Sequence, residues 1–258
     1  MTRRTDRRLA LLAGGLLALF FTMCAAISVA SWSVGTVEGN STRTIAGPVD
    51  ELVVESSNGD VTILRSDDGK IHIDGRAEGT LHAPAPRIEV DGSLVHVTAN
   101  CPVWGFGDCN SEVILRVPGS TAVTVDAGSG DIVARDLGGA ANLHTSSGDI
   151  AVDGSARDVT LDSGSGDIIA RALSGDRAMA ETASGDVDLR FAGPPLSADA
   201  DTGSGDIRIL VPSGVEDYRV EMDTGSGKTN TGVSESTSSN RLLRADSGSG
   251  DILIDYGG

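Results

Sequence analysis

The sequence predicts an all-β protein, a β-solenoid of the parallel β-helix type with stacked coils of about 20 residues, preceded by one N-terminal transmembrane helix. Two observations predict the solenoid: a Gly-Ser-Gly-Asp-like motif recurs along the chain, and apolar residues alternate on both sides of each copy. A third observation, an uncharged apolar run near the N-terminus, predicts the helix.

The glycine before the aspartate marks each copy of the repeat. Successive marker glycines are 18, 18, 19, 20, 22 and 23 residues apart. The markers are Gly130, Gly148, Gly166, Gly185, Gly205, Gly227 and Gly250, with an earlier copy at Gly59. A unit of nearly constant length that cannot bury an apolar face alone indicates neighbours stacked around a shared core.

Each unit has four apolar positions, seven and five residues before its marker and two and four after it. In the unit of Gly166 they are Val159, Leu161, Ile168 and Ala170. Alternate residues lie on one face of a strand, so each unit is predicted to be two short strands joined by a glycine corner. Glycine suits that corner because it adopts backbone angles that other residues avoid.

Two stretches depart from the regular unit. At Gly227, Lys228 replaces the aspartate and threonines replace the aliphatic residues, and we expect residues 229–240 to form a loop. Between about 49 and 120 the strands are unevenly spaced, and Asp91-Gly92 is typical of a hairpin turn, which predicts a widened N-terminal cap.

The last coil would leave a strand edge open. We expect this edge to be blunted by Asp255, covered by the N-terminal part, or paired with another copy of the chain through self-association.

The domain organisation follows from the N-terminal sequence. We expect a basic cytoplasmic tail (1–8), a transmembrane helix (9–31), a linker (32–48) and an extracytoplasmic β-repeat domain (49–258). The apolar run is long enough to cross a hydrocarbon layer of about 30 Å, and the arginines before it keep the N-terminus in the cytoplasm. A signal peptide cleaved after Ala30 is the less favoured alternative, and both place the β-repeat domain outside the cytoplasm.

The two cysteines of the β-repeat domain agree with its export from the cytoplasm. Cys101 and Cys109 are close in sequence and are predicted to form a disulfide in an oxidising compartment, the alternative being two free thiols.

The chain is strongly acidic. Its formal net charge of −17 disfavours nucleic acid as a partner. Aspartates recur in columns beside the glycine corner. They form a candidate cation ladder, with calcium as the ion and no other cofactor expected: Asp131, Asp149, Asp162, Asp167, Asp186, Asp201 and Asp206. The interpretation we favour is structural, each aspartate accepting a hydrogen bond from the backbone of its own corner.

Motifs that resemble catalytic signatures belong to the repeat. Asp201-Thr202-Gly203-Ser204 and a second copy from Asp223 spell the aspartic-protease motif, but they continue a series of corners and do not predict a pair of carboxylates sharing a proton. The stretch from Gly225 to Thr229 resembles the end of a phosphate-binding loop without its first glycine or a following helix. We predict no catalytic residues.

The serial Ser-Gly-Asp-Ile/Val units, the Leu115-Arg116-Val117-Pro118-Gly119 lead-in and the single membrane segment resemble the bacterial "putative adhesin" β-strand-repeat family, a domain of unknown function. The resemblance covers about residues 49 to 258 and implies a β-repeat fold without established catalytic residues.

We therefore expect a non-enzymatic protein of the cell membrane, held by residues 9–31, with an adhesin-like, structural or envelope-associated role. Its partners would be cell-wall polymer or envelope proteins. A carbohydrate-active β-helix enzyme and an accessory component of envelope-stress signalling remain open as alternatives.

Overall fold

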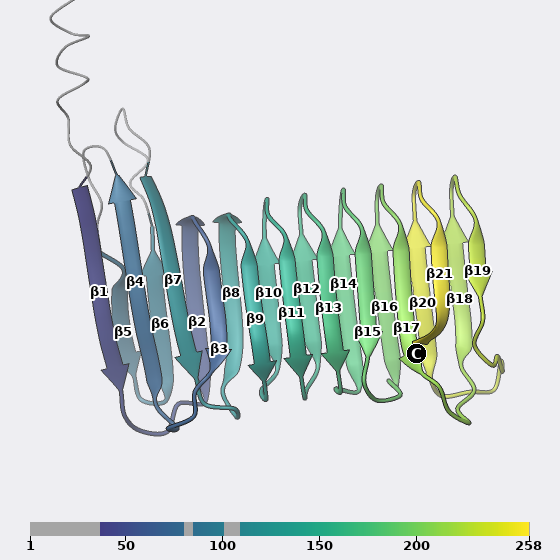
Figure 1. The fold of residues 1–258 in the computed structure, drawn as a ribbon, viewed down its shortest axis with the longest axis horizontal. Helices are drawn as coiled ribbons and strands as arrows, with labels where there is room; N and C mark the ends of the chain where they lie inside the picture. The colour runs from purple at the N-terminus through teal and green to yellow at the C-terminus, as the bar shows by residue number, and fades with distance from the viewer. Residues whose placement is uncertain (1–36, 80–84, 101–108, 258) are drawn as a thin grey trace, which may run out of the picture.

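The computed structural model describes residues 37–79, 85–100 and 109–257 as a long stack of β-coils (Figure 1). Two sheets of 11 and 10 strands, here sheet A and sheet B, run the length of the stack. No helix occurs in this part of the chain, and none there could span a membrane. The predicted tail (1–8) and membrane helix (9–31) lie outside the described residues.

In spatial order, sheet A contains β1 (Val37–Ile45), β4 (Ile71–Gly79), β7 (Cys109–Val117), β3 (Val61–Arg65), β9 (Ile132–Leu137), β11 (Ile150–Ser155), β13 (Ile168–Leu173), β15 (Val187–Phe191), β17 (Ile207–Pro212), β21 (Ile252–Gly257) and β19 (Thr229–Thr231). From the opposite end of the stack, sheet B contains β18 (Arg219–Thr224), β20 (Leu242–Ser247), β16 (Ser197–Thr202), β14 (Arg177–Thr182), β12 (Val159–Ser163), β10 (Ala141–Thr145), β8 (Ala122–Ser129), β2 (Glu51–Asn58), β6 (Leu94–Ala99) and β5 (Arg87–Asp91).

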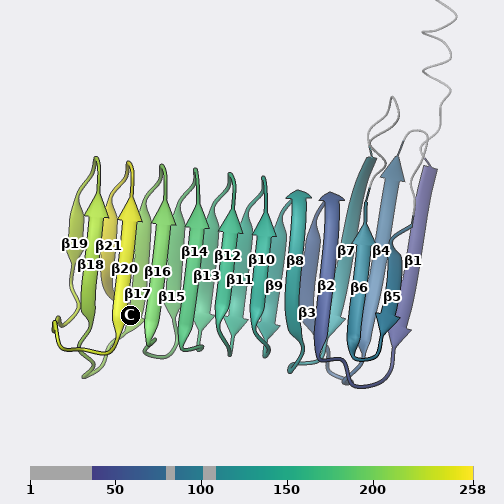
Figure 2. The same ribbon diagram turned by 180° about the vertical axis from the view of Figure 1, so that it is seen from behind.

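Each coil is one strand of sheet B, a glycine corner and one strand of sheet A. Equivalent positions of neighbouring coils pair in parallel register, as Leu161 does with Leu143 on one side and Ala180 on the other. The corners therefore line up along one long edge of the molecule, which Figures 1 and 2 show from its two sides. The predicted stacking of about 20-residue coils is confirmed.

The core lies between the two sheets and is made almost entirely of Val, Ile, Leu and Ala. Leu161 and Ile168, from two strands of one coil, have no exposed surface. The predicted inward positions are buried in the regular coils because alternate side chains of a strand point to the same face.

The marker glycines are required by both conformation and space. Gly185 has a φ of 148°, which L-residues with a Cβ avoid. A Cβ at Gly185 would also collide with the carbonyl oxygen of Gly166 in the preceding coil. The backbones of neighbouring corners lie too close for any side chain.

A ladder of hydroxyls, most of them buried, runs inside the corners, three residues before every marker from Gly148 onward. Thr202 Oγ1 donates to the carbonyl oxygen of Gly185 at 2.9 Å, and Ser163 Oγ to that of Gly148 at 2.9 Å. Each hydroxyl satisfies a carbonyl of an adjacent coil that would otherwise be buried without a partner. This ladder was not predicted, although Ser or Thr recurs at this position in most units.

The C-terminal coils are stacked out of sequence order. The last coil, β20–β21, lies between β16–β17 and β18–β19, so the coil of Gly227 ends the stack. Its position explains the replacement of aliphatic residues, because Thr229 is exposed and Val220 and Met222 are only half-buried there. Asp255 lies in β21 between β17 and β19, so the expectation that it blunts an open edge was wrong.

The loop between β19 and β20 covers part of this end. It begins after Thr231, so the predicted loop was correct except for its first three residues, which form β19. Tyr218 has no exposed surface; its N–H donates to Ser234 O and its carbonyl accepts from the N–H of Ser236. Self-association through the remaining edge of β18 stays a prediction.

The N-terminal end is an antiparallel cap, as the uneven spacing predicted. β4 pairs antiparallel with β7, and β5 pairs antiparallel with β6 around the predicted Asp91-Gly92 turn. β1 pairs along its whole length with β4, so the prediction of a linker for residues 32–48 was wrong over 37–45. Its polar, Ser/Thr-rich composition suits an edge strand with little buried surface.

Candidate functional site

A continuous row of aspartates follows the glycine corners along the edge of sheet A. In spatial order this corner row is Asp60, Asp131, Asp149, Asp167, Asp186, Asp206 and Asp251, with Lys228 at its end. In each step Oδ1 of one aspartate accepts a hydrogen bond from the backbone N–H of the next residue in the row, at 2.8–3.0 Å. The row thus connects eight coils.

This bonding corrects the favoured structural interpretation of the aspartates. Each aspartate does accept a hydrogen bond from a backbone N–H group. That N–H group belongs to the adjacent coil, however, and not to the aspartate's own corner. Asp186, for example, accepts from Asp206, 20 residues later in the chain. Sequence reasoning missed this because it cannot show that the N–H after one corner faces the carboxylate of the previous one.

The other predicted ladder residues, Asp162 and Asp201, lie on the outer face of sheet B. Adjacent strands there form the sheet B row: Glu55, Asp126, His144, Asp162, Glu181, Asp201, Asp246 and Asp223. Partial burial, with the charges of Asp246 and Asp199, raises the pKa of Asp201. The seven predicted residues therefore belong to two separate rows.

Neither row forms a compact group of ligands within the described residues. No set of three or more His, Cys, Asp or Glu side chains in residues 37–79, 85–100 and 109–257 is arranged to hold a metal ion. The calcium ladder stays a prediction that calorimetry can test.

The aspartic-protease look-alikes are separated in the structure. Asp201 lies on β16 and Asp223 on β18, and β20 with Asp246 lies between these two strands. The two motif aspartates therefore do not face each other across a cleft, as a proton-sharing pair would require.

A shallow groove runs beside the corner row over the last coils of sheet A. It has a volume of about 550 Å³ and crosses β13, β15, β17, β21 and β19. The carboxylates of Asp167, Asp186, Asp206 and Asp251 border it. Its floor is formed by residues that neighbour one another across the strands: Ile169, Asp188, Arg208, Leu253 and Asn230.

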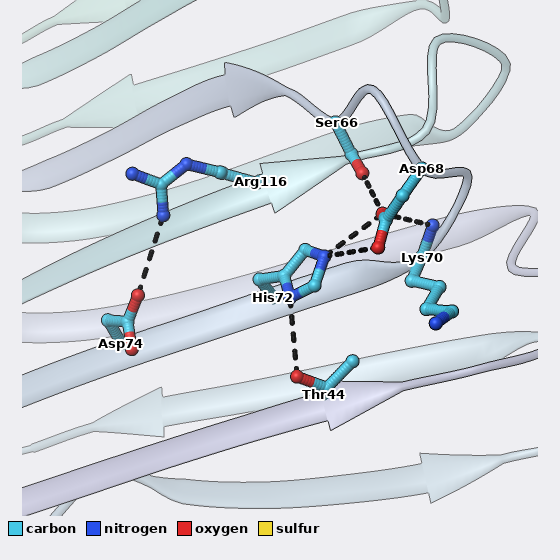
Figure 3. Close-up of polar contacts among 7 residues, drawn as sticks. All are labelled: Thr44, Ser66, Asp68, Lys70, His72, Asp74 and Arg116. Atoms are coloured by element: carbon cyan, nitrogen blue, oxygen red, sulfur yellow. Dashed lines mark hydrogen bonds and ion pairs between the residues drawn. The ribbon is translucent and has the colours of Figure 1, made fainter.

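A second polar cluster lies on the N-terminal cap and is shown in Figure 3. His72 Nε2 is 3.0 Å from both carboxylate oxygens of Asp68, and His72 Nδ1 is 3.2 Å from Thr44 Oγ1. Asp68 also accepts hydrogen bonds from Ser66 Oγ and the backbone N–H of Lys70. The hydrogen bond with His72, then those from Ser66 and Lys70, hold the pKa of Asp68 well below its usual range.

This hydroxyl–imidazole–carboxylate series joins β1, β4 and the turn before β4. The nearby groove of about 240 Å³ is lined by residues such as Thr42, Asp74 and Arg76, and not by Thr44 or His72. We therefore interpret the cluster as a clasp that fixes the edge strand. The sequence does not predict this contact of His72, because Thr44 lay in the expected linker.

Cys109 is disulfide-bonded at the start of β7. Cys101 lies outside the described residues, so its pairing with Cys109 stays a prediction.

Comparison with known proteins gives one family and several solved structures of low similarity. No curated protein matches the sequence. A "putative adhesin" of Bacteroides fragilis is 14% identical, with 84% of this chain and 96% of that chain covered and a TM-score of 0.46. A "putative cell adhesion protein" of Clostridium sporogenes is 13% identical, with 86% and 100% covered and a TM-score of 0.40.

The family model named Toastrack DUF4097 matches residues 120–256, more than half of the sequence. The matched segment starts just before β8 and includes every regular coil described above. The chain belongs to the Toastrack DUF4097 family.

Proposed function

We propose that this protein is a non-enzymatic, membrane-anchored module that presents its β-solenoid outside the cytoplasm in an adhesin-like role. The observation that carries the proposal is the corner row, a continuous line of exposed carboxylates whose backbone hydrogen bonds hold it rigid. Rigid, repeated charge on a long edge suits binding to an extended partner in the envelope.

The arrangement of side chains favours binding over catalysis. In the described residues the aromatic side chains are Phe191 and Tyr218, both buried, and the half-buried Tyr256. Tyr256 is also engaged, since its hydroxyl oxygen accepts a hydrogen bond from the backbone N–H of Ser234. This part of the surface therefore offers no aromatic platform of the kind that carbohydrate-active enzymes use to stack sugars.

Labelling on intact cells tests the placement of the module. Val215 is 97% exposed, so a Val215→Cys variant of the full chain presents an accessible thiol. We expect a membrane-impermeant maleimide to label this variant on intact cells, and not a Thr5→Cys variant of the N-terminal tail. Labelling of the tail variant, or protection of the Val215 variant until the cells are lysed, would overturn the proposed topology.

The non-enzymatic part of the proposal is tested separately. Incubation of the purified full chain with wall and capsule polysaccharides is expected to give no cleavage products. Products that disappear on substitution of residues in one groove would instead establish the carbohydrate-active alternative.

A further inference from the structure

The end of the stack formed by β18 and β19 leaves one strand of sheet B with a free edge (Figure 2). Among the described strands β18 pairs only with β20, and Arg219 N–H, for example, donates to the carbonyl oxygen of Arg241 just before β20. Alternate residues of a strand direct their N–H and C=O groups to opposite sides. Val220, Met222 and Thr224 therefore direct theirs away from the stack.

The chain itself begins to fill the place beside this edge and then leaves it. In a parallel bridge, Tyr218 N–H donates to Ser234 O and the Tyr218 carbonyl accepts from Ser236 N–H. The chain then turns, with Ser239 N–H donating to Ser236 O. A parallel strand thus starts beside Tyr218 but does not continue along residues 219–224.

The free edge also exposes apolar side chains. Val220 and Met222 are half-buried, whereas their neighbours on β20, Leu243 and Ala245, are buried. β18 lacks the features that usually protect an edge, since its six residues alternate regularly without proline, lysine or a bulge. An added strand would complete both the hydrogen bonds and the packing of this end.

Two β18 strands from different copies of the chain match poorly. A two-fold axis makes them antiparallel, and the residues that direct backbone groups outward must face one another. If Met222 faces Met222, Glu221 of each copy lies opposite Asp223 of the other, and like charges directly opposite destabilise a sheet. If Val220 faces Met222, the other copy lies beside Tyr218, where the loop after β19 is already bonded.

The N-terminal end of another copy fits no better. Beyond the coil of β2 and β3, the described part of sheet A has three more strands (β7, β4 and β1) and that of sheet B has two (β6 and β5). At the other end, β18 and β19 belong to one coil. A copy that placed β5 beside β18 would therefore place β1 where β19 lies. These arguments favour a strand of a different protein.

We propose that the edge of β18 binds an extended segment of a partner protein, which joins sheet B as a parallel strand beyond the short bridge at Tyr218. This inference rests on the proposed function and names the kind of partner. The direction follows from the chain's own bridge, which is parallel, and from the parallel pairing of β18 with β20. In such a complex main-chain hydrogen bonds supply affinity and alternate side chains supply specificity.

The side chains around the edge define the chemistry of the segment. Its inward residues would cover Val220 and Met222 and should be apolar. On the outer face Arg219 Nε lies 3.3 Å from Glu221 Oε1, whereas Asp223 has no ion pair in the part of the chain that the structure describes. The segment should therefore place a basic residue beside Asp223, with an apolar residue before and after it.

Fluorescence anisotropy with the full chain in detergent micelles tests the proposal. The probe is a fluorescein-labelled Ser-Val-Thr-Val-Lys-Val peptide. One competitor carries N-methyl groups on the backbone nitrogens of its Thr and Lys, which would donate to the carbonyls of Val220 and Met222 in the parallel arrangement. A second carries them on the valines that follow, whose N–H groups would point away from β18. We expect the first to bind at least about tenfold more weakly than the second.

Two variants at one position test the edge from the protein side. Met222→Pro and Met222→Thr both lose the apolar side chain, but only proline removes the outward N–H. That N–H makes no bond to β20, so the pairing of β18 should be kept, and melting temperatures check that both variants fold. Met222→Pro should bind the probe at least about fivefold more weakly than Met222→Thr.

A further pair of variants tests the charge. Asp223→Asn should weaken binding of the probe about two- to fivefold, because it removes the partner of the lysine at an exposed position. Asp126→Asn removes the same charge from the sheet B row on β8, away from the edge, and should leave the affinity unchanged.

Several results would overturn the inference. They are no binding of the probe, equal binding of the two methylated competitors, loss of binding with methyl groups on the valines alone, and equal affinity of Met222→Pro and Met222→Thr. Sedimentation of the full chain tests the competing occupant, since a concentration-dependent dimer that Met222→Pro abolishes would show that a second copy fills the edge. Because the maleimide experiment does not depend on β18, failure here leaves the proposed topology standing.

Discussion

Oδ1 of Asp186 accepts a hydrogen bond from the backbone N–H of Asp206 at 2.8 Å, although the two residues belong to different coils. The carboxylate of Asp206 accepts from Asp251 in the same way. The aspartate that follows each corner therefore stabilises the stacking of coils, and it does so at the surface, where it also carries charge.

This relationship predicts different effects for two substitutions of Asp186. Asp186→Asn keeps the oxygen acceptor, so the free energy of unfolding should stay within about 0.5 kcal/mol of the wild type. Asp186→Ala removes the acceptor and should lower the free energy of unfolding by about 1 kcal/mol. Urea unfolding followed by circular dichroism measures both, and equal effects would contradict the ladder's structural role.

The marker glycine should be far less replaceable than a glycine in an open loop. Gly205 has a φ of 154°, and a Cβ there would collide with the carbonyl oxygen of Gly185. Gly205→Ala should therefore lower the free energy of unfolding by roughly 2–4 kcal/mol.

Gly193 provides the control for this substitution. It lies in the loop after β15, has no positive φ, and a Cβ there would meet no atom within 4 Å. Gly193→Ala should therefore cost less than about 1 kcal/mol in the same unfolding experiment. Similar losses for the two variants would show that the marker position is not special.

The stacking order predicts the result of removing the last coil. β18 pairs only with β20, and β19 pairs only with β21, among the described strands. A chain ending at Asn240 should lose amide-exchange protection over residues 219–231 as well, because that coil has no other partner. Protection retained over residues 219–231 in the truncated chain would contradict the dependence of β18 and β19 on the last coil.

The clasp on the N-terminal cap predicts a dependence of stability on pH. A carboxyl whose pKa is lower in the folded than in the unfolded state stabilises the fold above the unfolded pKa, and this contribution is lost as the pH falls. For Asp68 the ordinary value is 3.8, so the contribution should be complete near neutral pH and should decline below about pH 4.

Thermal unfolding of wild type and Asp68→Asn between pH 2.5 and 7 measures this contribution. The difference in melting temperature should be largest at neutral pH and should shrink on acidification, as the wild-type carboxyl becomes protonated. Asp67→Asn, at the exposed neighbouring position, should give a curve parallel to the wild type. A constant difference between Asp68→Asn and wild type would exclude titration of Asp68 as the cause.

The repeat, the two strands of each coil and their buried faces were predictable because they depend on local pattern. Val159, Leu161, Ile168 and Ala170 alternate in a way that fits only one face of two strands. A glycine at a fixed offset from these residues marks the corner. These features arise within about 20 residues and repeat, so the period and register could be determined from the sequence by itself.

The tertiary structure decided what depends on contacts between coils. The hydrogen bond from Asp206 to Asp186, the placement of β20–β21 inside the stack, and the clasp between Thr44, His72 and Asp68 all join residues that are not local in sequence. The coils share one pattern of apolar and glycine positions, so this local pattern does not distinguish their order in the stack. That order is fixed by which coil tolerates an exposed end, and the coil of Gly227, with threonines in place of aliphatic residues, has the least apolar surface to lose there.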